Sequence, residues 1–211
     1  MQIALALLLF VPAWSLRFWE AWLYWCVSTA ATLATALYFL KRDPALMERR
    51  LEVGARAEPL RSQKTIQGIG GALVCAIYVV AGLEHRSQAS SLPATIVLTG
   101  DVFVLAGFAL TFRVFMENTF TAATIKVEPG QRVIATGPYA LVRHPMYTAA
   151  MLGYLATPFA LGSRWALIPA VLICASIVAR LLDEERHLRE WLPGYDVYSR
   201  KVRYRLLPQI W

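Results

Sequence analysis

The sequence predicts an all-α protein whose helices cross a membrane several times. Hydrophobic residues make up 57% of the 211 residues, charged residues make up only 17%, and the mean hydropathy is +0.47. A soluble globular domain usually contains about 25% charged residues. The apolar residues also gather into runs that are separated by polar, mostly basic stretches. Together these observations indicate a polytopic membrane protein before any motif is considered.

Six apolar runs follow one another along the chain. A helix that crosses a bilayer needs about 20 residues, with about 17 as a lower limit. The second and fourth runs pass this length comfortably, whereas the others are shorter. The first run lacks the basic start of a signal peptide, so we expect it to be a retained helix. The runs cover residues 3–16, 19–40, 66–83, 93–116, 146–162 and 165–182.

The lysines and arginines predict how these helices are oriented. They are dense in residues 41–65 and after residue 179, are present in 117–145, and are reduced to Arg86 in 84–92. By the positive-inside rule, the richer segments and both termini face the cytosol, across what we expect to be the cell inner membrane. Because the net charge of +7 comes from loops between apolar runs, we expect membrane lipids as partners and no nucleic acid.

The last two apolar runs predict a helical hairpin that turns at "GSR", residues 162–164. The polar stretch "GPYALVRHPMY" (137–147) precedes the hairpin, and a second polar stretch (179–208) follows it. Both would then meet at one membrane face as a cytosolic cap, where a water-soluble cofactor and a lipid-soluble substrate can meet. We therefore divide the chain into N-terminal transmembrane helices (1–116) and a catalytic half (117–211).

Charged residues at the end of the last run are candidates for this site. Arg180 and Glu184 are four residues apart and His187 follows three later, so that a helix places them on one face. They could form an ordinary surface salt bridge, which is worth only a few tenths of a kcal/mol. Arg180 lies near membrane depth, however, where an ionisable residue is a functional candidate. We expect Asp183 and Glu185 to be solvated or to pair with the arginines that follow.

The "RHP" triplet at 143–145 predicts a helix start. Pro145 suits the first position of a helix, and the residue before a proline favours an extended backbone. The backbone amides of residues 144–147 would then lie at a helix N-terminus, which attracts anions. The triplet is either a basic anchor at the membrane interface or part of a pocket for a ligand carboxylate, walled by Tyr139 and Tyr147.

Three other features are interpreted as structural. "QGIGGA" (67–72) does not complete a dinucleotide-binding fingerprint and predicts close packing of helices through small residues. The cysteines Cys26, Cys75 and Cys174 lie in apolar runs and are expected to be small buried hydrophobes, so no metal site is predicted. Asp101 is expected to pair with a neighbouring helix.

The two polar stretches resemble those of known membrane enzymes. "TGPYALVRHPMYTAAML", followed by "RLLDEERHL" and "LPGYDVYSRKVRYRLLP", is similar to the isoprenylcysteine carboxyl methyltransferase family, in its prokaryotic form. The resemblance extends over roughly residues 118–208, and "KRDPALMERR" and "FMENTFTAATIKV" also resemble prokaryotic members. Phospholipid N-methyltransferases and NADPH-dependent sterol reductases have similar C-terminal halves.

The resemblance implies S-adenosylmethionine as cofactor and a set of site residues. Glu184 would hold the cofactor, with Asp183 as its rival, and Arg180 would face the carboxylate of the acceptor. An upstream polar contact of the family has no clean match, and Thr124 is a guess for it. The other implied cofactor contacts are Gln131, Arg132, Val133, Ile134, Tyr139, His144, Pro145, Met146 and Tyr147.

The expected activity is methyl transfer to a lipophilic acceptor. A carboxylate is already ionised at pH 7 and needs no general base, and a guanidinium binds it through two parallel hydrogen bonds. The chain lacks the extra N-terminal helices of eukaryotic members, so the family name does not fix the acceptor, which can be a prenylated substrate or a lipophilic small molecule, either a carboxylic acid or a thiol. The alternatives are an NADPH-dependent reductase of related fold and a non-enzymatic membrane scaffold or transporter.

Overall fold

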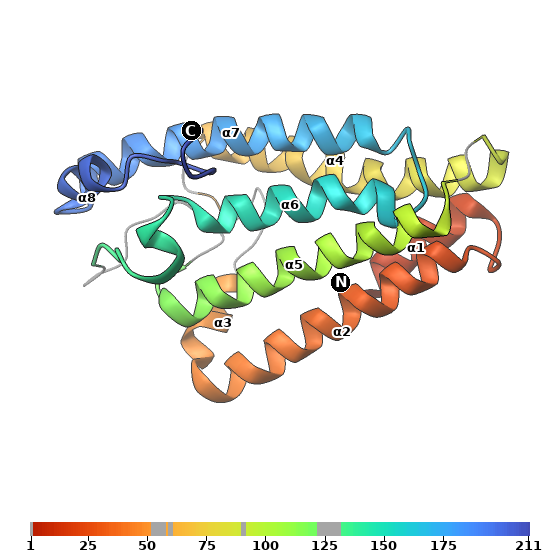
Figure 1. Ribbon diagram of the computed structural model, residues 1–211, viewed down its shortest axis with the longest axis horizontal. Helices are drawn as coiled ribbons and strands as arrows, with labels where there is room; N and C mark the ends of the chain where they lie inside the picture. The colour runs from red at the N-terminus through yellow and green to blue at the C-terminus, as the bar shows by residue number, and fades with distance from the viewer. Residues whose placement is uncertain (1, 52–57, 59–60, 90–91, 122–131) are drawn as a thin grey trace.

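A computed structural model describes residues 2–51, 58, 61–89, 92–121 and 132–211. Within these ranges the chain forms helices and turns, and no strand occurs (Figure 1). This agrees with the predicted all-α class. The helices are α1 (Gln2–Ala13), α2 (Trp19–Arg42), α3 (Pro44–Leu51), α4 (Arg61–Ser87), α5 (Ala94–Glu117), the short 3₁₀ helix η1 (Gly137–Ala140), α6 (Pro145–Ala160), α7 (Leu167–Trp191) and α8 (Tyr195–Lys201).

Three of the described helices are long and apolar enough to cross a membrane. They are α2, α4 and α5, with 24, 27 and 24 residues. Helix α1 is apolar but has only 12 residues, and α6 has 16. The described helices therefore support an integral membrane protein, while a six-segment topology remains a prediction.

The helices run side by side, with their connections gathered at two opposite ends (Figure 1). The α1–α2, α4–α5 and α6–α7 connections lie at one end. Helices α3, η1 and α8 lie at the other. Helices α6 and α7 are antiparallel neighbours joined by a short turn, as expected for a hairpin. The two polar stretches are thus brought to the same end of the bundle.

The end of the bundle without polar stretches is held together by a buried carboxylate. Glu84 of α4 accepts hydrogen bonds from the Ser163 hydroxyl, from the Trp165 amide at 3.1 Å and from the Arg164 amide at 3.3 Å. Gly162 makes this turn possible, because its φ of +65° lies in the left-handed region that favours glycine. One side chain of α4 therefore fixes the closed end of the α6–α7 hairpin.

Close helix packing occurs at glycines other than those of "QGIGGA". A Cβ added to Gly82 would lie 2.6 Å from the Leu9 carbonyl oxygen of α1, and one added to Gly100 would collide with the backbone of Ala160 in α6. These positions have to be glycine because the neighbouring backbone occupies the space of a side chain.

The prediction of close packing at residues 67–72 was wrong. A Cβ added to Gly68 or Gly71 meets no atom within 4 Å, and one added to Gly70 meets only the Ser176 hydroxyl, at 3.8 Å. The glycines of this segment leave space beside α4 instead of bringing another helix against it.

Two further expectations also differ from the structure. Cys26 and Cys75 are exposed on the outer surface of their helices, and Cys174 is buried as predicted. Asp101 is buried, but neither carboxylate oxygen has a hydrogen-bond partner among the described residues. The expected pairing of Asp101 with a neighbouring helix is therefore not found.

Candidate active site

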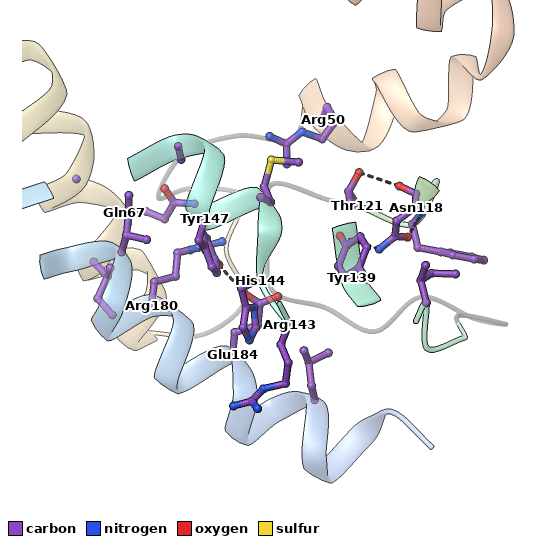
Figure 2. Close-up of a pocket in the computed structure, with 18 of the residues that line it drawn as sticks. Arg50, Gln67, Asn118, Thr121, Tyr139, Arg143, His144, Tyr147, Arg180 and Glu184 are labelled. Carbon is purple, nitrogen blue, oxygen red and sulfur yellow. Dashed lines mark hydrogen bonds between the residues drawn. The ribbon is translucent and has the colours of Figure 1, made fainter. Parts of the chain in front are cut away.

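A cavity of about 700 Å³ lies at the end of the bundle where the polar stretches meet. Its volume is typical of a site for a small molecule or cofactor, for which about 300–1,000 Å³ is usual. Figure 2 shows side chains from α3, α4, α6, α7 and η1 arranged around it. Nine residues proposed from the sequence line it: Arg132, Val133, Ile134, Tyr139, His144, Met146, Tyr147, Arg180 and Glu184.

One predicted contact is not among the described wall residues, and another predicted contact and one guess fall outside the part of the chain that the structure describes. Pro145 is fully buried as the first residue of α6, as predicted, and is not among the described wall residues. Gln131 and Thr124 lie outside the described residues. The cavity therefore brings most of the predicted residues together, and their individual roles remain predictions.

Tyr147 connects the two charged candidates of α7. Its hydroxyl accepts a hydrogen bond from Arg180 Nε at 3.0 Å and donates one to Glu184 Oε2 at 2.5 Å. The two residues share one helix face as predicted, and the phenol of α6 lies between them (Figure 2). This arrangement fixes the direction of the Glu184 carboxylate beside the cavity.

The other two nitrogens of the Arg180 guanidinium bind Glu58 and Gln63, which lie before and at the start of α4. Arg180 Nη2 forms an ion pair with Glu58 Oε1 at 2.6 Å, and Nη1 donates to Gln63 Oε1 at 2.9 Å. Only 8% of Arg180 and 2% of Glu58 are exposed to solvent. Sequence reasoning missed Glu58, because nothing in its spacing indicates that it meets a residue more than a hundred positions later.

Asp183 points towards α4 instead of into the cavity. Its carboxylate accepts hydrogen bonds from Gln63 at 2.5 Å and Ser62 at 2.9 Å, and the hydrogen bond from Gln63 lowers its pKa. Glu184 lines the cavity, and Asp183 is not among the described wall residues. The geometry therefore favours Glu184 over its rival as the carboxylate that faces a ligand.

Glu185 has a different environment from the one expected. It is 4% exposed and accepts hydrogen bonds from Arg143 Nε at 2.6 Å, Arg205 Nε at 2.9 Å and His144 Nε2 at 3.3 Å. Burial raises the pKa of Glu185, but these hydrogen bonds outweigh burial and hold the pKa well below its usual range. The expectation that Glu185 is solvated or pairs with the next arginines was wrong. The guanidinium of Arg143 points towards α7, where it donates to Glu185 (Figure 2).

Residues 204–206, near the C-terminus, pack against the start of α6. The Tyr204 and Arg205 carbonyl oxygens accept hydrogen bonds from the backbone amides of Arg143 and His144, both at 2.9 Å, and the Leu206 carbonyl accepts one from the Thr148 hydroxyl at 2.8 Å. The amide of His144, which was expected to face an anion, is thus used within the chain. Residues 204–206 form the base on which the "RHP" triplet rests.

Tyr139 is held from two sides at the wall of the cavity. Its hydroxyl accepts from Asn118 Nδ2 at 3.1 Å, and its carbonyl oxygen accepts from the Tyr198 hydroxyl at 2.8 Å. Burial raises the pKa of Tyr139 to about 12, so the phenol stays neutral at physiological pH. Tyr139 can therefore donate a hydrogen bond to a ligand in this pocket.

Several wall residues were not proposed from the sequence. Some of them belong to stretches that resemble the family, but no spacing rule indicates that these stretches meet. They include Arg50 in "KRDPALMERR", Asn118 and Thr121 in "FMENTFTAATIKV", and Tyr195 and Tyr198 in "LPGYDVYSRKVRYRLLP". The glycines of α4 were assigned to packing. The missed wall residues include Arg50, Ile66, Gln67, Gly70, Gly71, Val74, Asn118, Thr121, Ser176, Tyr195 and Tyr198.

These features define a helical membrane protein with a large cavity, lined by both polar and apolar side chains, at one end of its bundle. Residues 95–193 match a family model described as phospholipid methyltransferase. The matched stretch contains η1, α6, α7 and all of α5 except its first residue, and therefore Tyr139, Tyr147, Arg180 and Glu184. The match supports the predicted resemblance at the level of this broad group of membrane methyltransferases, which generally use S-adenosylmethionine. A comparison with curated proteins found no match.

Proposed function

We propose that this protein is an integral membrane methyltransferase that transfers a methyl group from S-adenosylmethionine to a lipophilic acid. The observation that supports this most directly is the single cavity in which Glu184 and Tyr139 share a wall with apolar residues of α4 and α7. Such a cavity can receive a polar cofactor and an apolar acceptor side by side. We further propose that it opens to the cytosol at the cell inner membrane, as the basic residues predict.

The residues at the polar wall fit the cofactor. The Glu184 carboxylate can accept hydrogen bonds from the cationic amino group, and Tyr147 holds that carboxylate in place. The rings of Tyr139 and Tyr147 offer π-faces to a cationic sulfur. When bound, S-adenosylmethionine supplies a methyl group that its sulfonium has already activated. The protein therefore contributes mainly by positioning the reactants and keeping water out.

The other part of the wall fits a lipophilic acceptor. It contains apolar side chains from three helices and also the arginines of α3 and α7. A carboxylate would be stabilised by these cations and needs no general base at pH 7. A lipid amine would have to lose a proton and would be repelled by them, so we favour an acid, such as a prenylated cysteine or a small lipophilic acid. The apolar wall residues are Ile66, Val74, Ala150, Ile173 and Ile177.

Cofactor selectivity tests this proposal. The protein purified in detergent should melt at a higher temperature with S-adenosylhomocysteine, because a ligand that binds only the folded state stabilises it. Stabilisation by NADPH instead would indicate a reductase of related fold. No stabilisation by either compound would favour a scaffold or transporter. Incubation of the protein with methyl-labelled S-adenosylmethionine and a lipid extract should then label a compound that alkali hydrolyses, as expected for a methyl ester.

A further inference from the structure

The cation expected to hold the acceptor is already engaged by the protein itself. All three nitrogens of the Arg180 guanidinium have partners: Tyr147, Gln63 and the buried carboxylate of Glu58. Glu58 in turn accepts a hydrogen bond from Gln67 Nε2 at 3.1 Å. An acceptor carboxylate at Arg180 would have to compete with an internal carboxylate that has the same charge and excludes solvent. Arg180 is therefore well placed to hold Tyr147 and Glu184 in position.

A second arginine approaches the cavity from another element. Arg50 is in the last turn of α3 and lines the cavity, and in Figure 2 it enters from the side opposite α7. Its guanidinium carbon lies 5.2 Å from the ring centroid of Phe115, which is within cation–π distance. The ring holds the planar group against α5 and orients it. Burial lowers the pKa of Arg50, because it disfavours the charged form of the guanidinium.

Arg50 and the proposed cofactor pocket share the same neighbours. Among the described residues, the titratable and charged groups that act on Arg50 include Tyr147 and Tyr154 of α6, Tyr139 of η1 and Arg180 of α7. Tyr147 also donates to Glu184, so an anion bound beside Arg50 would lie close to the group that we assign to the cofactor.

We propose that Arg50 recognises the anionic group of the acceptor, and that Arg180 is a positioning residue that acts through Tyr147. This assignment rests on the proposed function and names the residue that determines specificity for an acid. It moves acceptor recognition from the matched stretch, residues 95–193, to α3, which lies outside it.

A matched pair of variants tests the assignment. Arg50→Gln removes the charge at the cavity, whereas Arg49→Gln removes the neighbouring charge, which instead binds the Thr119 carbonyl oxygen at 2.5 Å and is not among the described wall residues. The probes are N-acetyl-S-farnesylcysteine and its carboxamide, which differ only in the acidic group. Binding is measured in detergent with the protein saturated with S-adenosylhomocysteine.

The wild-type protein and Arg49→Gln should bind the acid more tightly than the amide. Arg50→Gln should bind the acid about 10- to 150-fold more weakly and should bind the amide as the wild type does, because a hydrogen bond to a charged group contributes about 1.5–3 kcal/mol. Its stabilisation by S-adenosylhomocysteine should persist, which also shows that it folds. If Arg50→Gln does not fold, Arg50→Lys replaces it and should retain part of the preference for the acid.

Two results would overturn the assignment. One is a wild-type protein that does not distinguish the acid from the amide. The other is an Arg50 variant that keeps the full preference. If S-adenosylhomocysteine stabilises neither the wild-type protein nor the variants, the proposed function fails, and the comparison of acid with amide without cofactor still decides the role of Arg50.

Discussion

Replacing Glu184 by glutamine tests the proposed cofactor pocket most directly. The Tyr147 hydroxyl engages Oε2 of Glu184 at 2.5 Å, and we expect the other oxygen to accept from the amino group of the cofactor. Glutamine keeps the shape of the side chain but removes the negative charge. A hydrogen bond to a charged group contributes about 1.5–3 kcal/mol. The dissociation constant of S-adenosylhomocysteine should therefore rise about 10- to 150-fold, since about 1.4 kcal/mol corresponds to a factor of ten.

The adjacent carboxylate provides the control. Asp183→Asn removes the same charge one residue earlier, but Asp183 binds Ser62 and Gln63 of α4 and not the cavity. It should lower thermal stability and leave the affinity for S-adenosylhomocysteine unchanged. Titration calorimetry of both variants in detergent measures this. Unchanged affinity in a folded Glu184→Gln, or a greater loss in Asp183→Asn, would refute the assignment.

Three further predictions concern stability, the acceptor and topology. Glu185→Gln should be less stable than wild type at pH 7 by about 3 kcal/mol, as expected when a buried ion pair is broken. Because folding lowers the pKa of Glu185, the stability difference between wild type and Glu185→Gln should shrink as pH falls below about 4.3. A difference in melting temperature that does not change with pH would contradict the ion pairs of Glu185 with Arg143 and Arg205. Gly71→Leu should fill space beside the cavity and lower methyl transfer about tenfold, equivalent to about 1.4 kcal/mol, with cofactor binding intact. Gly68 is equally open but is not among the described wall residues, so Gly68→Leu should change neither methyl transfer nor cofactor binding. Equal losses of methyl transfer in the two variants would count against an acceptor at this wall. A reporter fused after Trp211 should be cytosolic and one inserted at Gln88 external, and a cytosolic signal at Gln88 would exclude the predicted topology.

Much of the helical framework could be predicted from composition and local pattern. The two long apolar runs correspond to α2 and α5, the shorter third run lies within the 27 residues of α4, and Pro145 begins α6 as its fixed φ and missing amide predict. The face shared by Arg180 and Glu184 follows from the helical repeat alone. These features depend on residues that are close in sequence, so the sequence contains what is needed to recognise them.

The partners of the charged residues could not be predicted in the same way. Glu185 looked like a surface residue because its sequence neighbours are charged, yet it is buried against Arg143 and Arg205. The Glu58–Arg180 pair likewise joins positions that only the folded bundle brings together. The glycines of "QGIGGA" show the same limit, since small residues permit close packing but also leave space. Only the position of the neighbouring helices distinguishes the two outcomes.

The packing of residues 204–206 against the start of α6 has a consequence for biosynthesis. The hydrogen bonds to Arg143, His144 and Thr148 can form only after every helix of the bundle has been translated. Helices enter the bilayer as they leave the ribosome, whereas the proposed cofactor pocket is complete only after a later segment has emerged. Insertion and maturation are thus separate events in time. A nascent chain can be fully embedded in the membrane while one side of its cavity is still missing.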